Sequence, residues 1–300
     1  MTDSLKAFAK INLYLRVLNR RDDGYHNILS LMAHAGLYDL LKLEKIEVRY
    51  VPGGDTEIKI RITGGCSEEM RSVPGQENLI SKAALKYFRT AGVSGRAEFS
   101  LEKNIPLGAG LGGGSADAAA ALKLLNETAG LMNAQELFAL GSTVGADVPF
   151  CLTGGFAICE GTGNVVLPVI SKLKCAVLIL NNGIQIETAG AYRALRRNSQ
   201  SIMDIGEILS VKDTMRSALE AGDLRSLAEI HINDFEKPAF RKHPEILDIK
   251  HALTGAGADF SAMTGSGSSV IGLFENREKA MKAEREFSKK IKYVILTDFI

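Results

Sequence analysis

The stretch NIPLGAGLGGGSADAAAAL, residues 104–122, leads from a run of glycines directly into an alanine-rich segment. The segment before it, RAEFSLEKNI, alternates as a strand does, and residues 115–129 have apolar positions at helical spacing. Glycine lets the backbone approach an anion closely, and the N-terminus of a helix offers unpaired N–H groups. The sequence therefore predicts a strand, an anion-binding loop and a helix in succession.

Two other phosphate motifs fit this stretch poorly. Gly108, Gly110 and Gly113 spell GxGxxG, but that dinucleotide motif requires a strand after the helix, and the segment from Asn133 indicates a second helix. The Walker motif requires a lysine directly after the glycines, whereas the next lysine is Lys123. A flexible linker is the remaining alternative, and the alanine-rich helix that follows disfavours it.

Composition indicates a globular protein of 300 residues, long enough for two packed domains. Apolar residues make up 46% and charged residues 24%, with a net charge of +1. This balance does not favour nucleic acid or a membrane surface as the main partner, and nothing indicates an obligate protein partner. Because the N-terminus lacks a basic region followed by an apolar core, we expect a cytoplasmic protein.

The four cysteines show no CxxC pair and no nearby histidine at ligand spacing. They are expected to be free thiols in the apolar interior, without a metal or a disulfide. These residues are Cys66, Cys151, Cys159 and Cys175.

Strand and helix patterns alternate in blocks along the chain. Strands are expected at 6–18, 28–36, 39–51, 57–63, 175–180, 259–263 and 269–274 and in the terminal KYVILTDF, and helices at 77–92 and over most of 187–253. Strands followed by helices in each half predict an α+β fold, with a boundary between residues 150 and 180.

A second glycine cluster, MTGSGSSVIGLF at residues 263–274, lies between two expected strands. A hairpin turn is one interpretation, because glycine and serine are common turn residues. The other is that both glycine clusters close on one phosphorylated ligand. Spacing alone favours the hairpin turn, and the presence of two such clusters keeps the ligand interpretation open.

The first cluster resembles the phosphate loop of the GHMP kinases, and the second resembles their C-terminal glycine motif. The segments AKINLYLRVLNRRDDGYHNILSLM, GADVPF, ICEGTGN and NDFEKPAFRKHPEI are similar, in this order, to the branch of that family whose acceptor is a diphosphocytidyl-methylerythritol. That resemblance implies ATP-dependent phosphorylation of the acceptor's 2-hydroxyl in non-mevalonate isoprenoid biosynthesis. It also implies a two-domain fold, with an N-terminal domain (1–160) like domain 2 of ribosomal protein S5 and a ferredoxin-like C-terminal domain (161–300), and the active site between them.

The same resemblance implies ATP with Mg²⁺ at the first glycine cluster. The ATP-binding residues would be Pro106, Leu107, Gly108, Ala109, Gly110, Leu111, Gly112, Gly113, Gly114, Ser115 and Ala116. Many GHMP kinases have serines where this chain has Gly113 and Gly114, a departure shared by the diphosphocytidyl branch. Ser115 is a candidate for a protein ligand of Mg²⁺, which is often held mainly by phosphate oxygens and water.

Lys10 and Asp147 match the family's catalytic pair, in which the carboxylate accepts the hydroxyl proton and the ammonium stabilises charge. From the residues alone, a cap before Pro149 is the favoured interpretation of Asp147, and the solvent face of a strand is the favoured interpretation of Lys10. Asn12 lies two residues after Lys10, on the same strand face, and matches a contact to the erythritol hydroxyls.

Tyr25 and His26, in DDGYH, match the family's cytidine-binding segment, and their rings suit a cytosine base. Two alternatives remain: a GHMP kinase for homoserine or a mevalonate derivative, and a binding protein of this fold that has lost catalysis. The first would lack the DGYH segment, and the second would be expected to have lost Lys10, Asp147 or the loop glycines.

Overall fold

The computed structural model describes residues 3–68, 77–199 and 203–300. The chain divides into two compact units. Unit 1 comprises Met1–Ala9, Leu37–Leu107 and Gly112–Thr153, and unit 2 comprises Lys10–Gly36, Gly108–Leu111 and Gly154–Ile300. The units interleave in sequence because two long strands each run from one unit into the other, whereas the domains predicted at 1–160 and 161–300 are contiguous. That predicted division stays a prediction.

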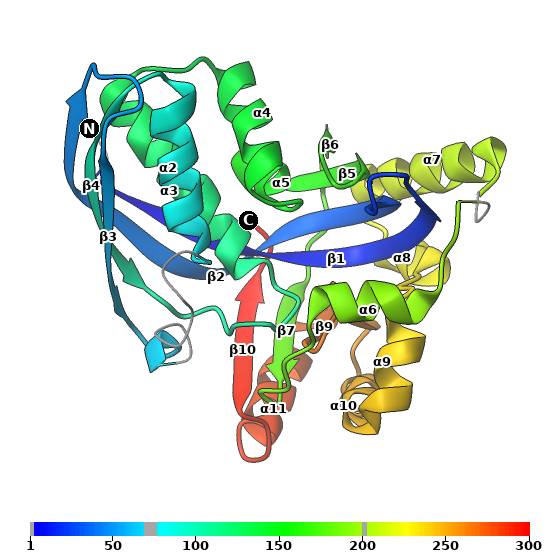
Figure 1. Ribbon diagram of the computed structural model, residues 1–300. Coiled ribbons are helices and arrows are strands. Elements are labelled where there is room, and N and C mark those ends of the chain that lie inside the picture. The colour runs from blue at the N-terminus through cyan, green and yellow to red at the C-terminus, as the bar shows by residue number, and fades with distance from the viewer. Residues whose placement is uncertain (1–2, 69–76, 200–202) are drawn as a thin grey trace. The chain divides into compact units, whose positions relative to one another are not determined.

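Unit 1 is a strand layer covered by helices (Figure 1). Its strands are the first part of β1 (Ser4–Arg20), the last part of β2 (His26–Arg49), β3 (Thr56–Thr63) and β4 (Ser94–Glu102). Its helices are α2 (Leu79–Thr90), α3 (Gly113–Ala129), α4 (Ala134–Val144) and α5 (Val148–Thr153). Strand β4 lies between β2, to which it is antiparallel, and β3, to which it is parallel.

The periodicity of the sequence explains this layering. Strand β3 alternates strictly between exposed and half-buried residues, because one face packs against α2 and the other faces solvent. Helix α2 begins at the N-cap Asn78 and buries the stripe formed by Ile80, Ala83, Ala84, Tyr87 and Phe88. Helix α3 is buried on nearly every side, which small alanine side chains allow, and α2 packs directly on it.

Unit 2 contains the other segments of β1 and β2 and a second sheet. In the first sheet, β2 pairs with β5 (Phe156–Gly161), and β5 pairs with β6 (Val165–Val169). The second sheet has four strands: β7 (Ala176–Asn181), β8 (Phe260–Met263), β9 (Val270–Phe274) and β10 (Tyr293–Asp298). The helices are α6 (Thr188–Leu195), α7 (Ile205–Ala221), α8 (Leu224–Ile230), α9 (Glu236–Lys242), α10 (Pro244–Gly255) and α11 (Arg277–Phe287).

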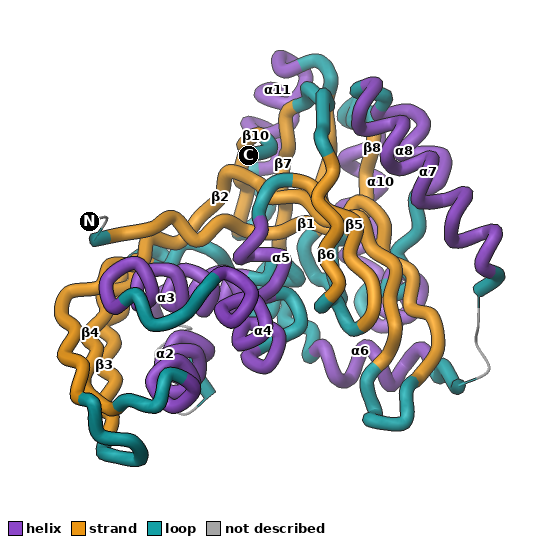
Figure 2. The backbone as a smooth tube through the Cα atoms, turned by 90° about the horizontal axis from the view of Figure 1, so that it is seen from above, coloured by secondary structure: helices purple, strands orange, loops and turns teal. Residues whose placement is uncertain are grey.

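The second sheet has the order β10-β7-β9-β8, and every pair in it is antiparallel. Helices come between β7 and β8, and α11 comes between β9 and β10, which is the β-α-β-β-α-β arrangement of ferredoxin-like domains. Helix α10 packs on β8 and β9, at one end of this strand order. Helix α11 packs on β7, β9 and β10, toward the other end. Figure 2 shows α8 and α10 beside β8. The predicted ferredoxin-like part is confirmed.

Most of the expected elements are present. The strands expected at 28–36 and 39–51 are one continuous strand, β2, and its register with β4 shifts between Leu43 and Lys45. The sequence analysis missed α5, β5 and β6, which are short and separated by glycine turns. Residues 200–202 of the expected helical region lie outside the described residues.

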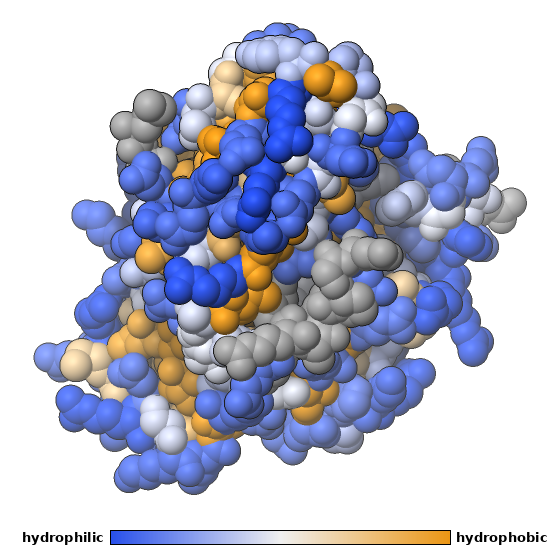
Figure 3. Space-filling view, turned by 60° about the vertical axis from the view of Figure 1, so that its left-hand side comes forward, coloured by the Kyte–Doolittle hydropathy of each residue, from blue (hydrophilic) through white to orange (hydrophobic). Residues whose placement is uncertain are grey.

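The surface that Figure 3 brings forward is mostly hydrophilic, with apolar patches between the hydrophilic residues. Of the helices that the structure describes, none combines the length and apolar character needed to cross a membrane.

Candidate active site

The first glycine cluster follows β4 and enters α3, as the sequence predicted. Gly108, Gly110 and Gly112 have φ values of 61°, 77° and 67°, in the left-handed region that favours glycine. Helix α3 begins at Gly113 without a side-chain cap. The N–H groups of its first turn therefore lack partners within the helix, which suits an anion. The strand-loop-helix arrangement is confirmed, and its ligand stays a prediction.

Some of the predicted site residues belong to unit 1 and the others belong to unit 2. Those in unit 1 are Pro106, Leu107, Gly112, Gly113, Gly114, Ser115, Ala116 and Asp147. Those in unit 2 are Lys10, Asn12, Tyr25, His26, Gly108, Ala109, Gly110 and Leu111.

In unit 1, Asp147 comes directly before α5, and the first turn of α3 lies beside its segment. The carbonyl oxygen of Asp147 accepts a hydrogen bond from the N–H of Cys151 at 3.0 Å. A Cβ atom on Gly145 would lie 3.6 Å from the hydroxyl oxygen of Ser115. Gly145, two residues before the half-buried Asp147, therefore lies next to the N-terminal turn of α3.

A buried charge cluster lies beneath the same turn. The ammonium of Lys103 donates to Asp39 Oδ2 at 2.5 Å and to Asp117 Oδ2 at 2.7 Å, and all three side chains are at most 2% exposed. Asp39 Oδ1 also accepts the N–H of Asn104 at 2.6 Å. A Cβ atom on Gly113 would lie 3.0 Å from Lys103 Nζ. The cluster thus joins β2, the end of β4 and α3 directly below the glycine turn.

The ionisation of this cluster depends on burial and on mutual attraction. Burial alone would lower the pKa of Lys103, but attraction to Asp117 and Asp39 outweighs it, so the pKa is raised. Burial, helped by repulsion from Asp39, raises the pKa of Asp117 to about 7 against the attraction of Lys103. The sequence analysis did not identify this cluster, because its members are far apart in the chain.

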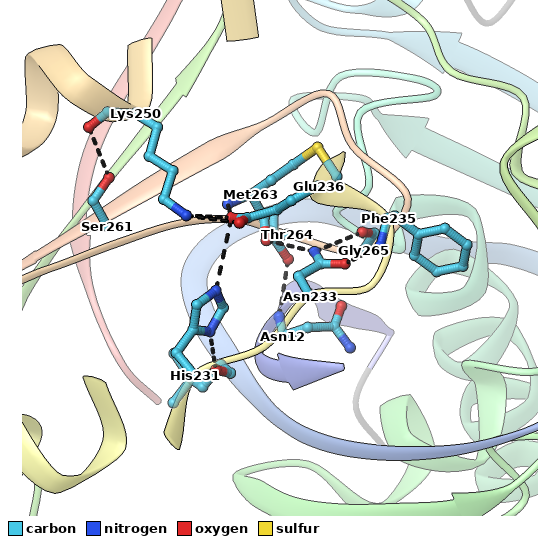
Figure 4. Close-up of polar contacts among 11 residues, drawn as sticks. Asn12, His231, Asn233, Phe235, Glu236, Lys250, Ser261, Met263, Thr264 and Gly265 are labelled. Atoms are coloured by element: carbon cyan, nitrogen blue, oxygen red, sulfur yellow. Dashed lines mark hydrogen bonds and ion pairs between the residues drawn. The ribbon is translucent and has the colours of Figure 1, made fainter. Parts of the chain in front are cut away.

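In unit 2, Lys10 is buried rather than on a solvent face, with an exposed fraction of 5%. Its ammonium donates to Asn12 Oδ1 at 2.7 Å, as expected for neighbours on one face of a strand. The side-chain amide of Asn12 donates to Ser30 Oγ at 2.8 Å, and its backbone N–H donates to Thr264 Oγ1 at 2.9 Å (Figure 4). Backbone contacts add to these, since the N–H of Lys10 donates to the carbonyl of Leu111 at 2.9 Å.

The second glycine cluster forms the connection of the β8–β9 hairpin and also contacts the first cluster. The N–H of Ser269 donates to the carbonyl oxygen of Ala109 at 3.1 Å. A Cβ atom on Gly265 would lie 2.7 Å from the carbonyl oxygen of Gly110 and 3.0 Å from Lys10 Nζ. The hairpin interpretation is therefore right, and the two clusters also come together around Lys10.

Tyr25 and His26 lie at the start of β2, after a turn in which Asp23 Oδ1 accepts the N–H of Tyr25 at 3.0 Å. The side chain of Tyr25 is 64% exposed. The ring of His26 stacks on Tyr192 of α6, with centroids 5.0 Å apart and planes 25° from parallel. Burial and the nearby Arg20 lower the pKa of His26, which favours the neutral ring. Tyr192 was missed because no motif in its helix distinguishes it.

Comparison with known proteins identifies the family. The model of the GHMP kinases N terminal domain matches residues 78–155, and that of the GHMP kinases C terminal domain matches residues 215–292. A 4-diphosphocytidyl-2-C-methyl-D-erythritol kinase of Caldicellulosiruptor saccharolyticus is 38% identical over 296 residues, covering 98% of this chain and 95% of that protein. The chain belongs to this family of GHMP kinases. It is a small-molecule kinase with the predicted two-domain α+β fold.

Solved structures agree with this kinase's membership. A crystal structure of a 4-(cytidine 5'-diphospho)-2C-methyl-D-erythritol kinase matches with a TM-score of 0.75 and 32% identity, covering 99% of this chain and 98% of that one. Homoserine kinase from Cytophaga hutchinsonii matches with a TM-score of 0.71 and 22% identity, over 99% of this chain and 95% of that one. The second likeness shows a shared fold alone.

Proposed function

We propose that this kinase transfers the γ-phosphoryl group of ATP to the 2-hydroxyl of 4-diphosphocytidyl-2-C-methyl-D-erythritol. The observation that supports this most directly is the placement of Lys10. Its ammonium lies beside Gly265 of the second glycine cluster, whose backbone contacts that of the first, so a cation and a surface free of side chains occur together. Phosphoryl transfer requires this combination of charge neutralisation and close backbone approach.

The first glycine cluster would hold the phosphates of ATP. Gly108, Gly110 and Gly112 leave the loop backbone without side chains, and the uncapped start of α3 adds unpaired N–H groups. Mg²⁺ would accompany the phosphates and neutralise their charge. Ser115, a hydroxyl donor in the first turn of α3, suits the hard oxygen chemistry of that ion, with phosphate oxygens and water as its other ligands.

Asp147 and Lys10 would perform the two catalytic roles. The acceptor's hydroxyl oxygen forms a bond to the γ-phosphorus, the bond from that phosphorus to the oxygen of ADP breaks, and the hydroxyl proton passes to the carboxylate of Asp147. Lys10 would stabilise the negative charge on the transferring group. The Lys10–Asn12 hydrogen bond supports this role, because it orients the ammonium without neutralising it.

Tyr25, His26 and Asn12 would bind the acceptor. The neutral His26 ring offers one donor and one acceptor nitrogen to a cytosine edge, and its stacking on Tyr192 fixes the ring plane. Asn12, whose amide is held by Ser30, would face the erythritol hydroxyls. The four cysteines, all among the described residues, form no disulfide, which supports a reducing compartment such as the cytoplasm.

The test is ADP release with ATP and a panel of alcohols. We expect kcat/KM for the cytidylyl compound to exceed that for methylerythritol phosphate, homoserine or mevalonate by about a hundredfold or more, because buried polar groups reject ligands that leave them unpaired. Comparable efficiency with homoserine or mevalonate would contradict the proposed acceptor and leave only a GHMP kinase.

A variant pair locates the base-binding segment. His26→Ala should raise KM for the cytidylyl compound by about tenfold, the loss expected for one hydrogen bond, and spare KM for ATP. His251→Ala, which removes an exposed imidazole from α10, is the matched control. A wild-type KM for the His26 variant would exclude this residue from acceptor binding.

A further inference from the structure

The segment NDFEKPAFRKHPEI, which begins at Asn233, has no role in the mechanism above. Its first residue nevertheless forms hydrogen bonds with the second glycine cluster. The side-chain amide of Asn233 donates to the carbonyl oxygens of Met263 at 2.7 Å and Gly265 at 3.0 Å (Figure 4). Its Oδ1 accepts the N–H of Phe235 at 3.0 Å. Asn233 is 7% exposed, and each of its side-chain hydrogen-bonding atoms has a partner.

A second residue of this segment bonds the same loop. Glu236 accepts the N–H of Met263 at 2.9 Å, and the ammonium of Lys250 holds its carboxylate at 2.7 Å. The imidazole of His231 lies 3.7 Å from Glu236 Oε1. Figure 4 shows the Lys250 ammonium and the His231 imidazole both directed at the carboxylate of Glu236, which lies beside Met263.

The opposite side of this loop faces the strand that bears Lys10. Thr264 Oγ1 accepts the N–H of Asn12, and Lys10 Nζ lies 3.0 Å from the position that a Cβ atom on Gly265 would occupy. Residues 263–265 are therefore fixed on one side by Asn233 and Glu236 and touch the lysine region on the other.

We propose that Asn233 is a positioning residue for Lys10. By holding the carbonyls of Met263 and Gly265, it sets the backbone wall against which the lysine ammonium lies. An amide that donates to two carbonyls fixes their separation and direction, which a single bond does not. This inference rests on the proposed catalytic role of Lys10, and it predicts a loss in turnover larger than any loss in ligand affinity.

The test compares substitutions at Asn233 with a matched substitution elsewhere. Asn233→Asp places a carboxylate against two carbonyl oxygens, and Asn233→Ser leaves one short donor. We expect kcat to fall by about tenfold or more for the first and by less for the second, with smaller changes in KM for either substrate. The control is Asn126→Asp, since Asn126 donates to the carbonyl of Met132 at 2.9 Å at the end of α3.

Thermal unfolding separates positioning from stability. Asn126→Asp should lower Tm and leave kcat within about twofold, whereas the Asn233 variants should lower kcat even at temperatures where circular dichroism shows them folded. Wild-type kcat in a folded Asn233→Ser or Asn233→Asp would overturn the proposal, as would a kcat that falls only with the folded fraction. If Lys10→Met retained activity, the proposed role of Lys10 would fail instead, whatever the Asn233 variants did.

Discussion

A Cβ atom on Gly265 would lie 2.7 Å from the carbonyl oxygen of Gly110, so the two glycine clusters of this kinase touch through their backbones. Both residues have a positive φ, 60° for Gly265 and 77° for Gly110. A side chain at either position would have to displace backbone rather than a flexible neighbour. The contact therefore makes the shape of the first cluster dependent on the second.

This contact predicts the effect of Gly110→Ala. The new methyl group would meet the carbonyl oxygens of Thr264 and Gly267. We expect KM for ATP to rise by about tenfold or more, a loss of about 1.4 kcal/mol, with a smaller change for the acceptor. Gly92→Ala is the control, because Gly92 has a φ of 69° with nothing within 4 Å of its Cβ position. Both variants should lose about 1–2 kcal/mol of stability from backbone strain. An equal KM for ATP in the two variants would contradict the proposed role of the loop.

Asp147→Asn should lower kcat by about a hundredfold or more, because an amide does not accept the hydroxyl proton as a carboxylate does. Calorimetric titration should show both ligands still binding, since the substitution is nearly isosteric. Asp248→Asn, in which the exposed carboxylate lies on α10, is the control and should have normal turnover. Near-normal kcat for Asp147→Asn would contradict the catalytic role of Asp147 and leave it only the role of a cap before Pro149.

Lys103→Met should destabilise the protein by about 3–5 kcal/mol, because it leaves two buried carboxylates without their cation. Adding Asp117→Asn should restore part of this loss by removing one of the uncompensated charges. Urea unfolding measures both changes. The control is Arg277→Met, which breaks the exposed pair with Asp298 at 2.6 Å and should cost at most about 1 kcal/mol. Equal losses for the two single variants would argue against a structural role for the buried cluster.

Glu236 should contribute to the dependence of stability on pH. Burial opposes its ionisation, but the nearby His231 imidazole and the hydrogen-bonded Lys250 ammonium outweigh burial and lower its pKa from 4.5. Its contribution is therefore complete above about pH 4.5 and is lost as the pH falls through the lower pKa of the folded state.

The free energy of unfolding should thus fall less steeply between about pH 5 and pH 3 in Glu236→Gln than in the wild type. Urea titrations at several pH values measure the slope. Glu278→Gln, which changes an exposed carboxylate in the first turn of α11, is the control. Parallel slopes for the wild type and Glu236→Gln would show that the ionised Glu236 adds no stability.

The sequence by itself determined the features that depend on neighbouring residues. The alternation before residue 104, the glycines from Gly108 to Gly114 and the alanine-rich segment after them predicted the strand, loop and helix, because periodicity and backbone freedom are local properties. The α+β class followed from the order of strand and helix patterns, and the family resemblance followed from motifs whose residues are close in the chain.

Only the tertiary structure decided how distant residues meet. Alternation was compatible with a solvent-facing Lys10, but the second glycine cluster, which follows some 250 residues later, covers that face and buries it. In the same way, His26 stacks on Tyr192 and Lys103 forms an ion pair with Asp39. Asn233 forms hydrogen bonds to the carbonyls of Met263 and Gly265. Burial and hydrogen bonding between remote segments are set by packing, and packing has no period in the sequence.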